Sequence, residues 1–258
     1  MSSWQALDDE LAAWAAAGQR ATFWWRDDDA AEDCPDLAQL LDLAETIAVP
    51  LVIAAIPATL RDAAVARIDA STAPQLAIVQ HGYAHTDHAR GGEKKIELGG
   101  TNRAQECRAH LHMGFEILSE RFGARFLPTL VPPWNRIDPA LIDHLPAVGY
   151  RTLSTYGARK AARTKFGLKQ INCHIDIVNW RQGAAFVGEA AALELACTHL
   201  RARRQNEVDM NEPTGLMSHH LRQDAAAWQF MAAFFAHLSG HPGAHWPKPT
   251  ALFGKAAK

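Results

Sequence analysis

The pattern of hydrophobic and polar positions along the chain alternates between two kinds of segment. Short continuous apolar runs, bounded by prolines or polar residues, are typical of strands buried on both faces. Between these runs, apolar residues recur every three or four positions, which predicts amphipathic helices. The pattern predicts strands at residues 22–25, 51–56, 75–80, 126–131, 150–154, 170–177 and 215–218, and helices at residues 4–17, 35–47, 59–69, 102–122, 138–147, 188–205 and 223–238.

Strands that alternate with helices about seven times indicate a parallel sheet with crossover helices. Over 258 residues, the simplest arrangement is a single α/β domain built as a distorted (β/α)7-type barrel. We expect this domain to span residues 1–258, with an N-terminal helix in residues 1–20 and a loosely structured tail at 240–258. The apolar face of the last predicted helix leaves room for a homodimer contact, although packing on the barrel is the simpler interpretation.

Composition and charge narrow the classes of function. The chain is 48% hydrophobic and 21% charged, as in ordinary globular proteins. Its net charge of -2 gives no electrostatic reason to expect binding to nucleic acid or to an anionic membrane surface. No apolar segment is long enough for a membrane span, and the first residues do not resemble an export signal, so we expect a cytoplasmic location. Four widely spaced cysteines form no C-x-x-C pair and are expected to be reduced thiols.

Polar residues follow two of the predicted strands directly. Asp27, Asp28 and Asp29 come after the first strand, and three adjacent acids repel one another unless water or a cation screens them. His81 and His85 follow the third strand as an H-x-x-x-H pair. The C-terminal ends of barrel strands meet at one face. Two imidazoles and one carboxylate there would supply three metal ligands and leave a position open for water, as hydrolytic zinc sites require.

Five segments, in their order along the chain, resemble the motifs of the polysaccharide deacetylase superfamily, the NodB-homology group of carbohydrate esterases. The family's T-F-D-D-G and H-[ST]-x-x-H patterns are similar to residues 25–29 and 81–85. Its R-x-P-[YW], D-x-x-D-W and L-x-H patterns are similar to residues 131–134, 176–180 and 217–219. The resemblance covers roughly residues 22–240. It implies a metal-dependent deacetylase that acts on an N-acetylated sugar or glycan precursor.

The resemblance also implies a role for each matching residue. Asp27 would be the general base and His219 the general acid, while Asp28, His81 and His85 would hold a divalent metal. Zinc is the first expectation for this metal, with cobalt, nickel and manganese as alternatives. The substrate would be a small molecule or glycan that carries an acetamide group.

Substrate contacts are carried over in the same way. The backbone N–H of Trp134, which follows Pro133 in the third motif, would stabilise the oxyanion. Trp134 and Trp180 would line the groove, because flat apolar rings suit the faces of sugars. The alternative for both tryptophans is packing in the core.

The first two motifs depart from the family pattern. Arg26 stands where the family usually has Phe, and Asp29 stands where it has Gly, so a second register stays open in which Asp28 is the base and Asp29 the metal ligand. Gly82 replaces the hydroxyl residue that usually helps to orient the second histidine, and its support must come from another residue.

The remaining motifs depart as well. Val131 replaces the arginine of the third motif, and either Arg136 or Arg26 would have to take its role. Asn179 replaces the second acid of the fourth motif, so Asp176, alone or with His174, is expected to support the catalytic histidine. His220 competes with its neighbour His219 for the role of acid.

Two other functions are consistent with the same residues. One is an amidohydrolase that acts on a non-sugar amide. The other is a sugar-binding or regulatory relative that keeps the metal or glycan site without turnover. The presence of both Asp27 and His219 argues against a pure binder, since binding alone requires neither a proton acceptor nor a donor.

Overall fold

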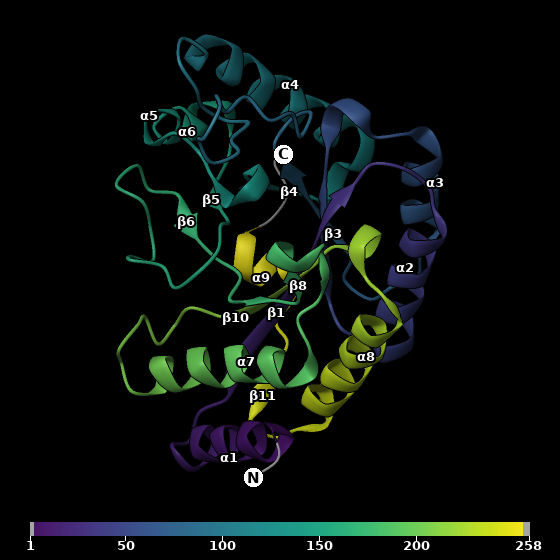
Figure 1. The fold of residues 1–258 in the computed structure, drawn as a ribbon, viewed down its shortest axis with the longest axis vertical. Coiled ribbons are helices and arrows are strands. Elements are labelled where there is room, and N and C mark those ends of the chain that lie inside the picture. Colours follow the sequence, from purple (N-terminus) through teal and green to yellow (C-terminus); the bar gives the residue numbers. More distant parts are fainter. Residues whose placement is uncertain (1–2, 255–258) are drawn as a thin grey trace.

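A curled, parallel β-sheet forms the centre of the computed structural model, which describes residues 3–254 (Figure 1). Its strands lie in the order β6-β5-β4-β3-β2-β1-β10-β7, and β11 pairs with the start of β1. The strands are β1 (Ala21–Ala30), β2 (Leu51–Ala55), β3 (Ala77–His81), β4 (Phe126–Val131), β5 (Thr152–Leu153), β6 (Lys169–Gln170), β7 (Ile175–Asp176), β10 (Thr214–Ser218) and β11 (Ala244–His245). This is the predicted α/β fold with a distorted barrel, in which the sheet curls without closing.

Helices surround the sheet, with α1 at the lower end of the view in Figure 1 and α4 at the upper end. They are α1 (Ser3–Ala16), α2 (Pro35–Ile47), α3 (Asp62–Ala70), α4 (Ala104–Phe122), α5 (Pro139–Ile142), α6 (Leu145–Val148), α7 (Glu189–Arg204), α8 (Ala225–Gly240) and α9 (Pro249–Phe253). Strands β8 (Val178–Asn179) and β9 (Ala185–Phe186) form a separate antiparallel pair.

The two-residue period of the strands divides the hydrophobic core into two layers. Phe23 and Trp25 of β1 belong to an outer core, together with the buried faces of α1, α2, α7 and α8. Trp24 belongs to an inner core on the concave side of the sheet, with Val52 and Val79 of the neighbouring strands. Side chains that alternate along β1 therefore point alternately toward the helices and into the barrel.

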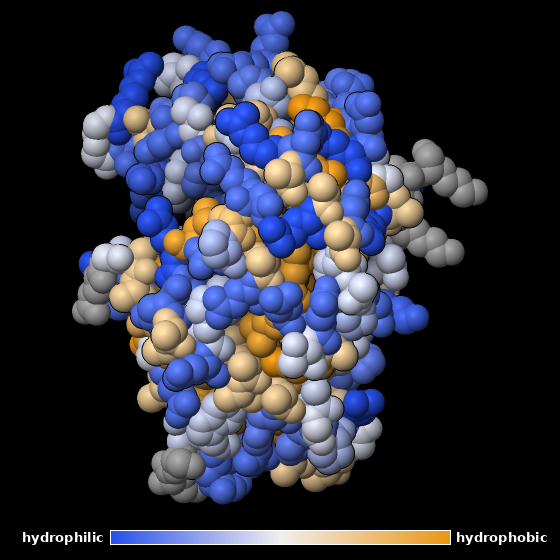
Figure 2. All heavy atoms as spheres, turned by 90° about the vertical axis from the view of Figure 1, so that its right-hand side faces the viewer, coloured by the Kyte–Doolittle hydropathy of each residue, from blue (hydrophilic) through white to orange (hydrophobic). Residues whose placement is uncertain are grey.

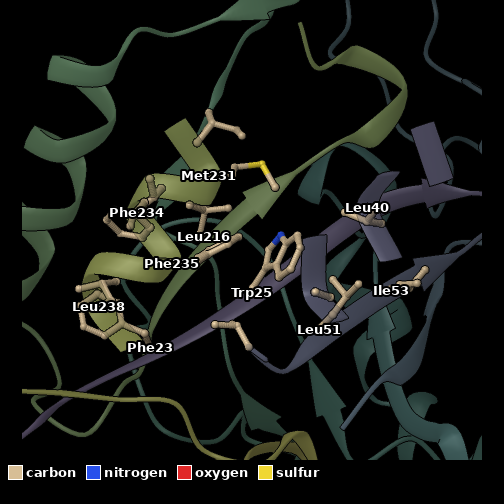
Figure 3. Close-up of a cluster of buried hydrophobic side chains, with 14 of the residues drawn as sticks. Phe23, Trp25, Leu40, Leu51, Ile53, Leu216, Met231, Phe234, Phe235 and Leu238 are labelled. Carbon is tan, nitrogen blue, oxygen red and sulfur yellow. The ribbon is translucent and has the colours of Figure 1, made fainter. Parts of the chain in front are cut away.

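Helix α8 covers β1 on the outer side, where its aromatic residues pack against Phe23 and Trp25 (Figure 3). The ring centroids of Trp25 and Phe235 lie 4.4 Å apart, and Phe23 meets Phe234 edge to face. The apolar face of this helix is buried against the sheet. It packs within the chain, as the simpler of the two interpretations expected, and no homodimer contact is needed to cover it.

Several elements differ from the prediction in length. Strand β1 continues through the three acids to Ala30 instead of ending before them. The predicted helix at 138–147 is two short helices, because Pro146 lacks a backbone N–H and is tolerated only in a first helical turn, here that of α6. The predicted strand at 170–177 is two short strands, β6 and β7.

Part of the tail that we expected to be loosely structured forms β11 and α9. Phe253 of α9 is buried in the inner core, where its ring meets that of Trp24 edge to face at 5.2 Å. The apolar side chain fills the barrel interior below the polar site, which explains why this segment is ordered.

The face that carries α2, α3 and α8 is mainly hydrophilic, and hydrophobic residues show through in narrow seams (Figure 2). Within residues 3–254, none of the helices combines the length and hydropathy that a membrane crossing requires.

We expect Phe253→Ala to lower the free energy of unfolding by about 3–5 kcal/mol, because it leaves a cavity in the inner core. Phe253 is only 1% exposed. The matched control is Phe166→Ala at a 37% exposed phenylalanine, for which the change should stay below about 1 kcal/mol. Urea-induced unfolding of the metal-free proteins measures both, and equal losses would contradict the placement of α9.

Candidate metal centre and active site

The alternation of side chains along β1 separates the first two acids. Asp28 lies on the same face as Arg26 and forms an ion pair with it, with Arg26 Nε and Asp28 Oδ1 2.7 Å apart. Asp27 lies on the opposite face, where its carboxylate accepts hydrogen bonds from Ser218 Oγ and from His220 Nδ1. Neighbouring positions on a strand point to opposite sides, so Asp27 and Asp28 do not face one ligand.

A backbone irregularity turns the third acid toward the histidines. The register between β1 and β2 shifts between Asp27 and Ala30, and Asp29 has a φ of 75°. Such left-handed geometry is uncommon for residues other than glycine, although Asp tolerates it better than most. As a result, Asp29 Oδ1 lies 3.0 Å from His81 Nε2 and 3.3 Å from His85 Nε2. The structure therefore places Asp29, and not Asp28, against the two histidines.

This group fits a divalent metal ion. His81 Nδ1 lies 3.1 Å from the Val131 carbonyl oxygen, which can only accept, so Nδ1 carries a hydrogen. In the neutral ring the lone pair is therefore on Nε2, which faces Asp29. Apart from these two histidines, the buried Oδ1 of Asp29 has no partner among the described residues. The His81 and His85 ring centroids are 5.1 Å apart, and two imidazoles on one tetrahedral zinc ion hold their centroids about 5 Å apart.

The pKa shifts in this group determine what a metal ion would meet. Burial opposes the ionisation of Asp29, but the hydrogen bond and charge of His81 overcome it and hold the pKa of Asp29 well below its usual range. Burial and the charge of His81 lower the pKa of His85. For His81, burial lowers the pKa, but Asp28 and Asp29 outweigh it and the pKa is raised. A cation that replaces the proton on His81 would therefore meet an ionised carboxylate and a neutral imidazole.

Arg26 and Asp28 form a buried pair beside the candidate metal ligands Asp29, His81 and His85. A second guanidinium nitrogen, Arg26 Nη2, donates to Asp28 Oδ2 at 2.9 Å. Arg26 also donates to Ser154 Oγ and to Asn135 Oδ1. Burial alone would lower the pKa of Arg26, but the charge of Asp28 raises it overall. Of the two arginines considered from the sequence, Arg26 contacts Asp28, whereas Arg136 Nη1 donates to the Lys95 carbonyl oxygen.

His219 lies next to this pair. Its Nε2 is 3.9 Å from Asp28 Oδ2, and its ring meets the edge of the Trp180 indole at a centroid distance of 4.7 Å. Asp176 accepts a hydrogen bond from Trp180 Nε1 at 2.9 Å and another from the backbone of Val178. Asp176 therefore holds the indole that the histidine contacts, and burial raises the pKa of this carboxyl group.

The remaining residues predicted for the site lie at the same end of the sheet, but their contacts differ from one another. The Trp134 ring packs on His85 at 4.5 Å, and Trp134 has a φ of 54° in the turn after β4. Pro133 is buried in that turn. The Asn179 side chain accepts from the backbone N–H of Arg181. His220 is buried with Asp27.

The sequence reasoning missed three residues of the site: Ser154 and Asn135, which contact Arg26, and Glu97, which contacts the loop after His81. The position of Ser154 directly after β5, and that of Asn135 in the turn after β4, were available as a signal. No motif or spacing distinguishes Glu97.

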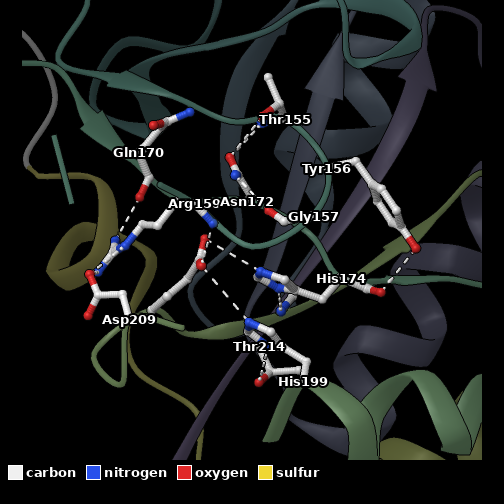
Figure 4. A network of polar contacts seen from close by, with 12 residues as sticks. Thr155, Tyr156, Gly157, Arg159, Gln170, Asn172, His174, His199, Asp209 and Thr214 are labelled. Atoms are coloured by element: carbon white, nitrogen blue, oxygen red, sulfur yellow. Dashed lines mark hydrogen bonds and ion pairs between the residues drawn. The ribbon is translucent and has the colours of Figure 1, made fainter. Parts of the chain in front are cut away.

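A second buried group, His174, His199 and Glu212, also brings metal-binding side chains together (Figure 4). Its geometry does not fit an ion. The backbone N–H of Gly215 donates to His174 Nδ1, so the hydrogen of the neutral ring is on Nε2, which faces Glu212 Oε1 at 3.4 Å. The two rings are stacked with their centroids 3.4 Å apart, too close for ligands of one ion.

This group is a buried polar cluster whose two histidines are held in the neutral form. Burial raises the pKa of Glu212 to about 7, lowers that of His174 to about 3, and lowers that of His199 strongly as well. Thr214 Oγ1 lies 3.0 Å from His199 Nδ1, and Glu212 accepts from the backbone N–H of Arg159. The cluster thus ties α7 to β10 and to the loop after β5.

Solved structures of polysaccharide deacetylases have the same fold. A Mycobacterium smegmatis protein assigned as a polysaccharide deacetylase superposes with a TM-score of 0.61 at 18% identity, over 84% of this chain and 74% of that chain. A family 4 carbohydrate esterase from Streptomyces lividans, in complex with acetate, gives 0.56 at 12% identity, over 93% and 97%. The Bc1960 peptidoglycan N-acetylglucosamine deacetylase gives 0.52 at 15% identity, over 91% and 88%.

No protein-family model matches the sequence, and no curated protein matches it.

We expect wild-type protein to lose stability relative to Glu212→Gln as the pH rises from about 4.5 to about 7. The pKa of Glu212 rises from 4.5 to about 7 on folding, so the folded state binds the proton more tightly, and the stability present below pH 4.5 is lost as pH passes through the folded pKa. Gln keeps the size of the side chain and does not titrate. Urea unfolding at intervals from pH 4.5 to 8 measures the difference.

The control for this measurement is Glu194→Gln, which removes a carboxyl group on the exposed side of α7 and leaves the buried cluster unchanged. A pH-independent difference for Glu212→Gln would show that the carboxyl group does not take up a proton on folding.

Proposed function

We propose that this chain is a divalent-metal-dependent hydrolase that removes the acetyl group from an N-acetylated sugar or glycan. The observation that carries the proposal is the convergence of Asp29, His81 and His85 with the acid–base candidates Asp28 and His219 at one end of the sheet. The shared fold with carbohydrate and peptidoglycan deacetylases supports it.

In this proposal, Asp29, His81 and His85 hold the metal, with zinc as the first candidate and cobalt, nickel and manganese as alternatives. When bound, the cation supplies the Lewis acidity that activates water near neutral pH and polarises the acetamide carbonyl. His81 is fixed for this role by the Val131 carbonyl oxygen, which sets its tautomer and ring orientation.

Asp28 is proposed as the general base that accepts a proton from the attacking water. Arg26 contacts both of its carboxylate oxygens and so fixes the direction in which Asp28 accepts the proton. This assignment uses the second register considered from the sequence. Asp27, the base in the first register, lies on the opposite face of β1, in the outer layer with Ser218 and His220 and away from the histidines.

His219 is proposed as the general acid that gives a proton to the leaving amine. Its Nε2 is the nitrogen nearer Asp28. The proposed proton donor, His219, and the proposed proton acceptor, Asp28, are therefore neighbours. Asp176 positions His219 through the Trp180 ring. The backbone N–H of Trp134, in the turn after β4, is proposed to stabilise the developing oxyanion.

Apolar surfaces beside the acid suit a sugar ring. Trp180, whose ring contacts that of His219, is 50% exposed, and Leu221, two residues after His219 in the chain, is 48% exposed. An indole ring can pack against the C–H groups of a pyranose, so the exposure of Trp180 favours a glycan over a smaller amide.

Two substitutions at neighbouring acids test the assignment. We expect Asp29→Asn to lose the metal, because it removes the charged ligand. Asp28→Asn should retain the metal and lose about 10²- to 10⁴-fold in turnover, the usual contribution of a general base. Metal content after dialysis and acetate release from N-acetylglucosamine oligomers measure the two properties. Asp33→Asn, at an exposed acid outside the site, is the control and should change neither.

Wild-type protein that holds no divalent metal after reconstitution would refute the proposed function. Metal loss in Asp28→Asn with retention in Asp29→Asn would instead restore the first register.

For the acid, we expect His219→Ala to lower turnover by about 10²- to 10⁴-fold with metal content unchanged. His220→Ala should chiefly lower stability, because it leaves Asp27 as a buried carboxylate without its charged partner. Acetate release, metal analysis and urea unfolding of both variants separate the roles. Normal turnover in His219→Ala would remove it from the mechanism.

A further inference from the structure

Glu97 is a buried carboxylate that contacts the loop between the two metal-binding histidines. The residue is 2% exposed. Its side chain accepts a hydrogen bond from the backbone N–H of Ala84 at 2.6 Å and from that of Tyr83 at 3.2 Å. A carboxylate that accepts from successive backbone N–H groups fixes the direction of that segment, and such charge-assisted bonds are stronger than neutral ones.

The loop that Glu97 holds is conformationally costly. Gly82 has a φ of 55°, and so does His85. For a residue with a side chain, the left-handed conformation costs roughly 1–2 kcal/mol relative to the right-handed one. It persists only where surrounding contacts determine it. The hydrogen bonds to Glu97 lie between these two residues and supply such contacts, so they help to present His85 to Asp29.

Gly82 leaves the space that Glu97 occupies. A Cβ atom placed on Gly82 would overlap Glu97 Oε2 and would lie 2.5 Å from Pro133 Cγ. A hydroxyl residue at position 82 and the Glu97 carboxylate therefore exclude each other. The Glu97 carboxylate can occupy its position only because residue 82 is a glycine.

The segment that carries Glu97 is itself anchored. Arg103 Nη1 donates to the Glu97 carbonyl oxygen at 3.1 Å, and the Cys107 thiol also lies against that oxygen. The next residue, Leu98, is buried and forms a β-bridge with Ile137. Because its backbone is held by α4 and by the segment after β4, the Glu97 carboxylate is a rigid support and not a mobile surface group.

We propose that Glu97 is a positioning residue of the metal centre, which orients His85 through the backbone of residues 82–84 and takes the place of a side chain at position 82. This inference rests on the proposed function, since it concerns the affinity of that site for its metal. The hydrogen bonds of the Glu97 side chain go to the backbone of Tyr83 and Ala84 and not to Asp29, His81 or His85. Its effect on the metal ligands is therefore through the loop between the two histidines. Outer residues that orient a ligand typically change metal affinity by 10- to 100-fold when removed.

The test measures metal affinity without turnover. We expect Glu97→Ala to weaken Zn²⁺ binding by about 10- to 100-fold in competition with a chromophoric chelator. Glu97→Gln keeps one acceptor oxygen and should lie between Glu97→Ala and wild type. The visible absorption spectrum of the Co²⁺-substituted protein should change in both variants, because it reports the ligand geometry. Glu93→Ala, at an exposed glutamate in the same loop, is the control and should stay within about twofold of wild type.

A double-mutant cycle tests the coupling to Gly82. Gly82→Ala should weaken Zn²⁺ binding in wild type, and this effect should be smaller in the Glu97→Ala background, because the overlap with the carboxylate has been removed. Urea unfolding of the metal-free variants establishes that they are folded. Unchanged Zn²⁺ affinity and an unchanged Co²⁺ spectrum in Glu97→Ala would overturn the inference while leaving the proposed function intact. Wild-type protein that binds no metal would refute the proposed function itself.

Discussion

The buried guanidinium of Arg26 constrains the side chains at the carboxyl end of the sheet, where its partners lie. An unpaired charge in such a place destabilises a fold by several kcal/mol, and Arg26 is completely buried. The chain meets this requirement with Asp28 from the same strand, Asn135 from the turn after β4 and Ser154 from the end of β5. Asp28 neutralises Arg26 from within β1, and the uncharged hydrogen-bond acceptors of Arg26 come from other strands of the curled sheet. The position of Asp28 beside His219 follows from this pairing.

Much of the fold could be predicted because its signal is local. Buried parallel strands such as β2 and β4 are continuous apolar runs, and α2 and α4 show the helical period over many turns. The limits of β1 could not be predicted in this way, since three acids in a row favour a loop. They continue the strand because Arg26, Ser218 and His220 neutralise or bind them, and the last two come from the far end of the sequence.

The candidate site was predicted in part for the same reason. Motif order and strand position are sufficient to select His81, His85 and the group of acids. They do not determine which acid faces the histidines, because this depends on the register shift after Asp27 and on the positive φ of Asp29. Glu97 and α9 lie outside every motif, and their places follow from tertiary contacts alone.

The position of β1 in the sheet has a consequence for synthesis on the ribosome. β1 pairs on one side with β2, which follows it closely, but its other neighbours, β10 and β11, belong to residues 214–245. Phe23 and Trp25 also stay uncovered until α8, which packs against them, has been synthesised. During most of translation the nascent chain therefore exposes an unpaired strand edge beside an uncovered aromatic surface, which are the features that promote aggregation. Protection by a chaperone until the last strands emerge would benefit this topology.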